Sequence, residues 1–213
     1  AHEIARGEAL RLAGGSSLRI DVGTRVRLVS SRERELESGA VYLDSDGAAA
    51  SSPPLEVATP LGRVTEIGTR FEVRLDAAER SGLDVRVRDG RVVLAEDSKA
   101  HEIARGEALR LGADGETERR SIDPRGAEWD WALAAAPVPE IEGRTLVEFL
   151  AWLERETGWA VRFEDAGLAE RAAGIRLHGS VEGLAPLEAA EVVLAGAGLE
   201  HRLEERTLRI RRR

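Results

Sequence analysis

The sequence predicts a mainly β first domain, a twisted β-solenoid or a β-sandwich, followed by a small α+β domain of the βαβ type. Residues 1–121 contain many short runs in which apolar and polar residues alternate, with turn residues between them. Residues 122–137 contain prolines and two tryptophans and follow neither a strand nor a helix period, which is typical of a linker. Apolar residues at helical spacing are found only in residues 138–213. Short strands at regular spacing are typical of both the solenoid and the sandwich.

The strand pattern of the first domain is clearest between Thr59 and Leu94. Before it, residues 10–43 give four short alternating runs separated by Gly, Ser and Thr, and residues 44–54 are a Ser, Ala, Gly and Pro-rich surface loop. Within the clearest stretch, residues 71–75 and 83–88 alternate so that each run presents one apolar face. Asp89-Gly90 separates two such runs and predicts a tight hairpin, because a primed turn needs positive φ.

A twelve-residue segment, AHEIARGEALRL, occurs twice without change, at residues 1–12 and 100–111. Each copy predicts two short extended pieces that meet at Gly7 or Gly106. One interpretation is that the two copies form equivalent strands of a stacked sheet. The other is a copying artefact at the N-terminus.

The second domain begins with a helix whose ends are both marked. Thr145 and Glu148 form a capping box, and apolar residues repeat at helical spacing until Gly158. We then expect a strand at 159–163, a strand at 175–181, a second helix at 186–194, and a terminal hairpin formed by the residues Leu199 to Leu203 and Leu208 to Ile210.

Composition excludes several classes of function. Asp and Glu outnumber Lys and Arg by 39 to 31, so we expect no nucleic-acid partner. Cys is absent, and no run approaches the roughly 20 apolar residues that cross a bilayer. The chain starts at Ala1 without Met or a charged and apolar leader, so we expect a piece of a longer product.

Catalytic and metal-binding patterns are also missing. His2 and His101 start a segment like the zinc-protease helix, but Arg occupies the position of the second histidine in both copies. Gly196-Ala197-Gly198 follows a helix and lacks the third glycine of a dinucleotide site. We therefore expect neither an enzyme, nor a metal site, nor a small-molecule cofactor.

Two phrases of the first domain resemble the periplasmic region of the FecR family of transmembrane sigma-factor regulators. LEVATPLGRVTEIGTRFEV is similar to a strand pair ending in V-x-x-x-G-T-x-F-x-V, and DVRVRDGRVVL is similar to the segment V-x-V-x-x-G-x-V. ARGEALRL matches the L-x-x-G-(Q/E) strand of the family more loosely. The matching positions are Val64, Gly68, Thr69, Phe71 and Val73 in the first phrase, and Val85, Val87, Gly90 and Val92 in the second.

The C-terminal part, Gly143 to Ile210, is similar to the short N-terminal module of secretins and TonB-dependent receptors. Together the two resemblances imply a periplasmic location, as the soluble part of an inner-membrane protein. They also imply that the signalling domain of a TonB-dependent outer-membrane receptor, loaded with ferric siderophore in the best-known system, is the partner. A sigma factor would be reached only through segments that this chain does not contain.

We expect partner binding by strand addition at an exposed edge of the second domain. The candidates are four residues of the last predicted strand, Thr207, Leu208, Arg209 and Ile210. Trp129 and Trp131, in the predicted linker, either dock the small domain on the first or form a partner hot spot. The alternative function is an envelope scaffold that binds a secretion or cell-wall component.

Overall fold

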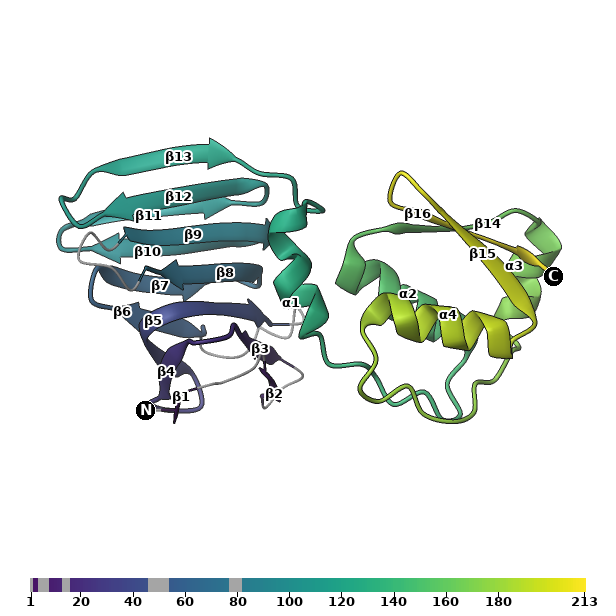
Figure 1. Cartoon of the computed structure of the whole chain (residues 1–213). Helices are drawn as coiled ribbons and strands as arrows, with labels where there is room; N and C mark the ends of the chain where they lie inside the picture. Colours follow the sequence, from purple (N-terminus) through teal and green to yellow (C-terminus); the bar gives the residue numbers. More distant parts are fainter. Residues whose placement is uncertain (1, 4–7, 13–15, 46–53, 77–81) are drawn as a thin grey trace. The chain divides into compact units, whose positions relative to one another are not determined.

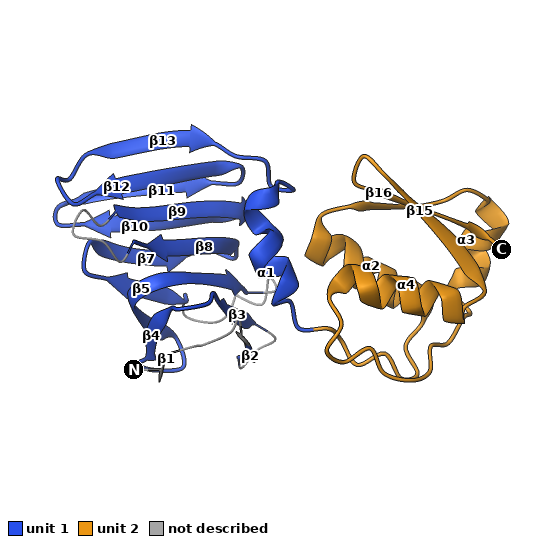
Figure 2. Ribbon diagram, in the orientation of Figure 1, with its two compact units in different colours: residues 1–137 blue, residues 138–213 orange. Residues whose placement is uncertain are grey.

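The computed structural model describes residues 2–3, 8–12, 16–45, 54–76 and 82–213. The chain divides into two compact units, residues 1–137 and residues 138–213 (Figure 2). Among the described residues, no helix is both long and apolar enough to cross a membrane.

Unit 1 is built mainly from strands and ends in one short helical segment (Figure 1). Its elements are β1 (His2–Glu3), β2 (Glu8–Arg11), β3 (Ser17–Ile20), β4 (Arg25–Leu28), β5 (Glu33–Asp44), β6 (Glu56–Thr59), β7 (Gly62–Glu66), β8 (Arg70–Leu75), β9 (Gly82–Asp89), β10 (Arg91–Glu96), β11 (Lys99–Ala104), β12 (Glu107–Gly112), β13 (Thr117–Ser121), the 3-10 turn η3 (Ala127–Trp129) and α1 (Asp130–Ala134).

The described strands of unit 1 form one 13-stranded sheet that curls around the main apolar core of this unit. The long strand β5 belongs to both arms of the sheet. Its first half pairs with β4 and β6, in a first arm that also contains β1, β7, β10 and β11. Its second half pairs with β3 and β8, in a second arm that also contains β2, β9, β12 and β13. The expected mainly β character is confirmed, whereas solenoid or sandwich stays a prediction.

Gly90 does not close the hairpin that the sequence predicts. The strands on either side of it lie in different arms: β9 pairs with β8 and β12, and β10 pairs with β7 and β11. Gly90 has φ of 76°, and a Cβ there would lie 2.6 Å from Cγ2 of Thr69. The glycine is thus needed for positive φ and for a close approach, but its turn carries the chain across the core from one arm to the other.

The repeated segment follows the same path at both of its positions. In the second copy, β11 lies in the first arm and β12 in the second, and Gly106 between them has φ of 77°. In the first copy, β1 and β2 are divided between the arms in the same way, while Gly7 lies outside the described residues. This placement is what equivalent strands require.

Unit 2 packs three helices with a three-stranded sheet around one apolar core (Figure 1). Its elements are α2 (Leu146–Thr157), β14 (Ala160–Phe163), α3 (Ala166–Ala172), α4 (Pro186–Gly196), β15 (Leu199–Glu204) and β16 (Thr207–Arg212). The predicted helices and the terminal hairpin are confirmed. The prediction of a strand at 175–181 is wrong, because the chain there forms only an isolated bridge between Arg176 and Thr145. Its apolar residues Leu177 and Val181 are nevertheless buried.

The capping box of α2 makes the stability of unit 2 depend on pH. The Glu148 carboxylate accepts hydrogen bonds from the backbone N–H of Thr145 (2.7 Å) and from its hydroxyl (2.9 Å), and these bonds lower the pKa of Glu148. Because the pKa is lower in the folded state, the stabilisation is complete above the unfolded value of 4.5 and is lost as the pH falls through the folded value.

We therefore expect Glu148→Gln to lower the melting temperature of unit 2 at neutral pH, and the difference from the wild type to shrink in acid. Thermal unfolding followed by circular dichroism at several pH values measures it. Glu191→Gln, an exposed change on α4, is the control. A difference that stays constant from neutral to acid pH would contradict the role of the ionised carboxylate.

Candidate functional site

Residues 127–134 cover part of the outer face of the second arm. Trp129, from η3, is fully buried and packs edge-on against Tyr42 of β5, with ring centroids 5.9 Å apart. Its indole N–H donates to the carbonyl of Asp123 at 3.0 Å. A small cluster of Tyr42, Ala108, Ile122, Trp129 and Ala132 therefore lies on the opposite side of the sheet from the main core.

Two buried arginines fix this segment on the sheet. Arg19 donates to the carbonyl of Ala132 at 2.8 Å, and its guanidinium lies 4.8 Å from the ring centroid of Tyr42. Arg88 donates to the carbonyl of Pro124 at 3.1 Å and lies 5.7 Å from the ring centroid of Trp129. Donation to carbonyls and contact with aromatic faces both stabilise a buried guanidinium.

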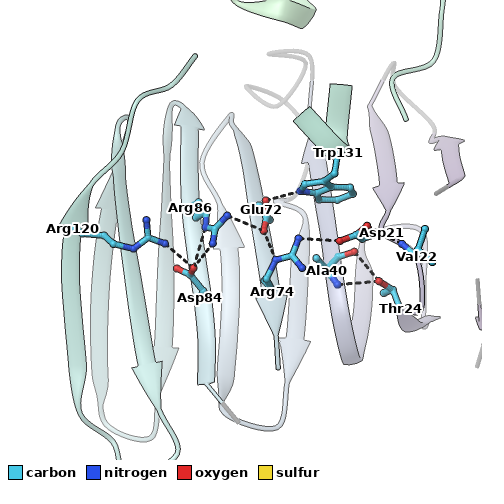
Figure 3. Close-up of polar contacts among 10 residues, drawn as sticks. All are labelled: Asp21, Val22, Thr24, Ala40, Glu72, Arg74, Asp84, Arg86, Arg120 and Trp131. Atoms are coloured by element: carbon cyan, nitrogen blue, oxygen red, sulfur yellow. Dashed lines mark hydrogen bonds and ion pairs between the residues drawn. The ribbon is translucent and has the colours of Figure 1, made fainter. Parts of the chain in front are cut away.

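Glu72 is the centre of the polar network on this face (Figure 3). Its side chain is fully buried, and it binds Arg74 at 2.9 Å and Arg86 at 3.6 Å. Its second oxygen accepts the indole N–H of Trp131 at 3.0 Å. Burial lowers the pKa of Arg74, but the charges and hydrogen bonds of Glu72 and Asp21 outweigh it, so the pKa is raised and the guanidinium stays charged.

The network continues across the neighbouring strands (Figure 3). Asp84 on β9 binds Arg86 and Arg120, each at 2.8 Å, and Arg74 binds Asp21 at 3.0 Å. Acids and arginines thus alternate along this series of ion pairs, and each named charge has a partner of opposite sign. Such an arrangement joins segment 127–134 to the sheet; it offers no activated nucleophile and no convergent acid and base pair.

Residues 122–137 were expected to be a linker, and this expectation is wrong for the part that carries the tryptophans. Trp129 is buried within unit 1, and Trp131 is partly buried and uses its N–H for Glu72. The partner-binding role of Trp129 and Trp131 stays a prediction. For Trp129 it requires η3 to leave the sheet first.

The last strand does not have the free edge that the sequence analysis expected. The strand order is β14-β16-β15, so β16 is central, parallel to β14 and antiparallel to β15. Leu208 and Ile210 are buried in the core, and only Arg209 points to solvent among these three. Strand addition at Thr207 to Ile210 is therefore wrong, because both sides of that strand are already paired. The residues 127–134 and the strand β16 lie in different units.

Sequence reasoning did not identify Glu72, Asp84, Arg19 or Arg88 as members of a site. Alternation correctly places Glu72 on the face opposite to Phe71 and Val73, but an alternating strand normally exposes that face to water. Among the described residues, no group of three or more His, Asp or Glu side chains could hold a metal ion.

Comparisons with known proteins find similar structures for the whole chain and a family match within unit 1. Two crystal structures of a candidate anti-sigma factor from Parabacteroides distasonis ATCC 8503, at 2.50 Å and 1.65 Å resolution, are similar to the whole chain. Each has a TM-score of 0.53 and covers 100% of this chain and 98% of the other, with 17% and 16% identity. A comparison with curated proteins finds no match. Residues 5–93, which span the sheet from β2 to β10, match the family described as FecR protein.

Proposed function

We propose that the chain is the sensor and signal-transducing binding module of a FecR-like anti-sigma regulator. In this proposal the module lies in the periplasm, as the soluble part of an inner-membrane protein. It receives its signal by protein contact from the signalling domain of a TonB-dependent outer-membrane transporter. The observation that carries the proposal is the match of residues 5–93 to the FecR family.

In this proposal the two units have different roles, unit 1 as a scaffold and unit 2 in partner binding. In unit 1, apolar side chains fill the core and the named charges of the outer face are paired with one another, as expected of a scaffold. Unit 2, whose sequence is similar to the short N-terminal module of secretins and TonB-dependent receptors, is the part we assign to partner binding. A sigma factor is reached through segments outside this chain.

We expect the purified chain to bind the purified signalling domain of a TonB-dependent receptor from the same genome. Isothermal titration calorimetry should give one site with a dissociation constant of about 1 μM, equivalent to about −8 kcal/mol. The matched controls are the N-terminal domain of a secretin and isolated peptidoglycan. Binding to either control, with none to the receptor domain, would contradict the signalling proposal and favour the envelope scaffold.

A further inference from the structure

The open edge of the unit 2 sheet is the outer edge of β15. Alternate residues of a strand direct their backbone groups to opposite neighbours. The turn Glu205-Arg206 has positive φ at both residues and closes the pair Glu204 and Thr207, so a hydrogen-bonded pair lies at its base. The backbone N–H and C=O groups of Glu204 and Arg202 therefore point toward β16. Those of Leu203 and His201 point outward, away from the sheet.

The opposite edge, on β14, is partly occupied. The N–H groups of Ala160 and Glu164 donate to carbonyls next to and within β16, so the backbone groups of Val161 and Phe163 point away from β16. The N–H of Val161 donates to the Glu154 carboxylate of α2 at 2.6 Å. Its carbonyl accepts from Arg162 at 2.9 Å. These contacts interrupt the ladder of free groups that a partner strand needs along β14.

Among the described residues, nothing comparable occupies β15. Within the described part of the chain, no side chain binds the outward backbone groups of His201 or Leu203. The side chain of Leu203 lies on the same face as buried Leu208, directly opposite it, yet Leu203 is 47% exposed. An exposed apolar side chain beside a free edge is the arrangement that a partner strand covers.

The solvent face of this sheet carries three arginines in one row. Arg162 of β14, Arg209 of β16 and Arg202 of β15 are register neighbours. Like charges directly opposite each other destabilise a sheet. Glu204 binds both Arg202 (2.7 Å) and Arg209 (3.0 Å), so one carboxylate serves two guanidinium groups. A strand added at the outer edge of β15 would place one of its side chains next to Arg202, as the fourth member of this row.

We propose that the outer edge of β15 accepts an extended segment of a partner protein, with an acidic side chain beside Arg202 and an apolar side chain beside Leu203. Backbone hydrogen bonds to His201 and Leu203 supply the pairing, and the two side chains select the segment. This inference deepens the proposed function and rests on it for the identity of the partner.

A second copy of the chain fits this edge less well than an acidic partner. The carboxylates of β15 are already bound within their own sheet: Glu200 binds Arg211 at 2.9 Å, and Glu204 binds Arg202 and Arg209. If the β15 strands of two copies paired, the second copy would bring further arginines to this edge. It would bring no carboxylate that is not already bound to an arginine of its own sheet. A partner segment with its own acidic residue brings one.

The test uses the full chain and two fluorescent peptides, one of alternating valine and glutamate and one of alternating valine and lysine. Fluorescence anisotropy should show the first peptide binding below about 1 mM and the second binding at least about tenfold more weakly. His201→Pro removes an outward N–H without removing a bond to β16, and it should weaken binding about tenfold or more. Arg202→Glu should weaken it to a similar degree.

The matched control is Arg162→Glu, which makes the same charge change in the same row at the occupied edge. We expect it to weaken binding by less than about twofold. Melting curves confirm that His201→Pro is folded, and Arg202→Glu provides an independent test if it is not. Equal losses for Arg202→Glu and Arg162→Glu overturn strand addition in favour of general electrostatic attraction. A concentration-dependent dimer without peptide binding overturns the acidic partner in favour of a second copy.

The receptor titration separates this inference from the proposed function. A receptor domain that binds wild type and His201→Pro equally refutes the β15 edge and leaves the proposed function standing. Peptide binding at β15 without receptor binding refutes the proposed partner and leaves the edge standing.

Discussion

Trp129→Ala should lower the free energy of unfolding of unit 1 by about 3–5 kcal/mol, the range for deleting a fully buried tryptophan. Trp129 has no exposed surface and packs on Tyr42 and Arg88, and its N–H is bound to Asp123. The truncation leaves a cavity between segment 127–134 and the sheet. It also removes the aromatic face that the Arg88 guanidinium contacts.

Urea denaturation followed by far-ultraviolet circular dichroism measures this loss, with the transitions of the two units fitted separately. Trp159→Ala, which deletes the same side chain from partly buried surface in unit 2, is the matched control and should leave the unit 1 transition unchanged. A loss below about 1 kcal/mol for Trp129→Ala, the size of an ordinary substitution, would mean that segment 127–134 is not anchored on the sheet.

Local patterns predicted those parts of the fold that depend on local physics. The alternation around Phe71 and Val73 gives the buried face of β8, because the two-residue period of a strand is independent of its neighbours. Thr145, Glu148 and Gly158 mark the ends of α2 for a similar reason, since a cap is formed within one turn of the helix.

The sequence did not show which strands become neighbours. Asp89-Gly90 and Glu205-Arg206 both separate alternating runs, yet only the second turn closes a hairpin. The difference depends on which arm of the sheet receives the next strand, and that is decided by packing across the core. The central position of β16 follows in the same way from its parallel pairing with β14, which lies more than forty residues earlier in the chain.

The polar network was hidden from sequence reasoning because its members are distant from one another. Trp131 and Glu72 are 59 positions apart. In the sequence, Trp131 has the ordinary interpretation of a tryptophan in a linker. Glu72 has that of the solvent-facing residue of an alternating strand. Only the fold shows that the indole N–H meets the carboxylate and that α1 excludes water from Glu72.

Glu72→Ala should destabilise unit 1 by about 3 kcal/mol, the lower end of the range for removing one partner of a buried ion pair. The lower end applies because Arg74 and Arg86 keep 32% and 18% of their side-chain surface exposed, so water compensates part of the lost charge. Glu72→Gln retains an oxygen that can accept the N–H of Trp131 but removes the negative charge. We expect the Glu72→Gln variant to be less stable than the wild type and more stable than Glu72→Ala.

A double-mutant cycle with Trp131→Phe isolates the contact between α1 and the network. Trp131→Phe removes the N–H donor to a charged acceptor, a loss of about 1.5–3 kcal/mol, and it replaces the indole that lies 5.8 Å from the Arg74 guanidinium with a smaller ring. If the indole and the carboxylate act as a pair, the double variant should be less destabilised than the sum of the single variants by about 1 kcal/mol in urea denaturation. Strictly additive costs would show that Glu72 stabilises the sheet through its arginines alone. The position of α1 would then depend on Trp129, Arg19 and Arg88, because their contacts with the sheet do not involve Glu72.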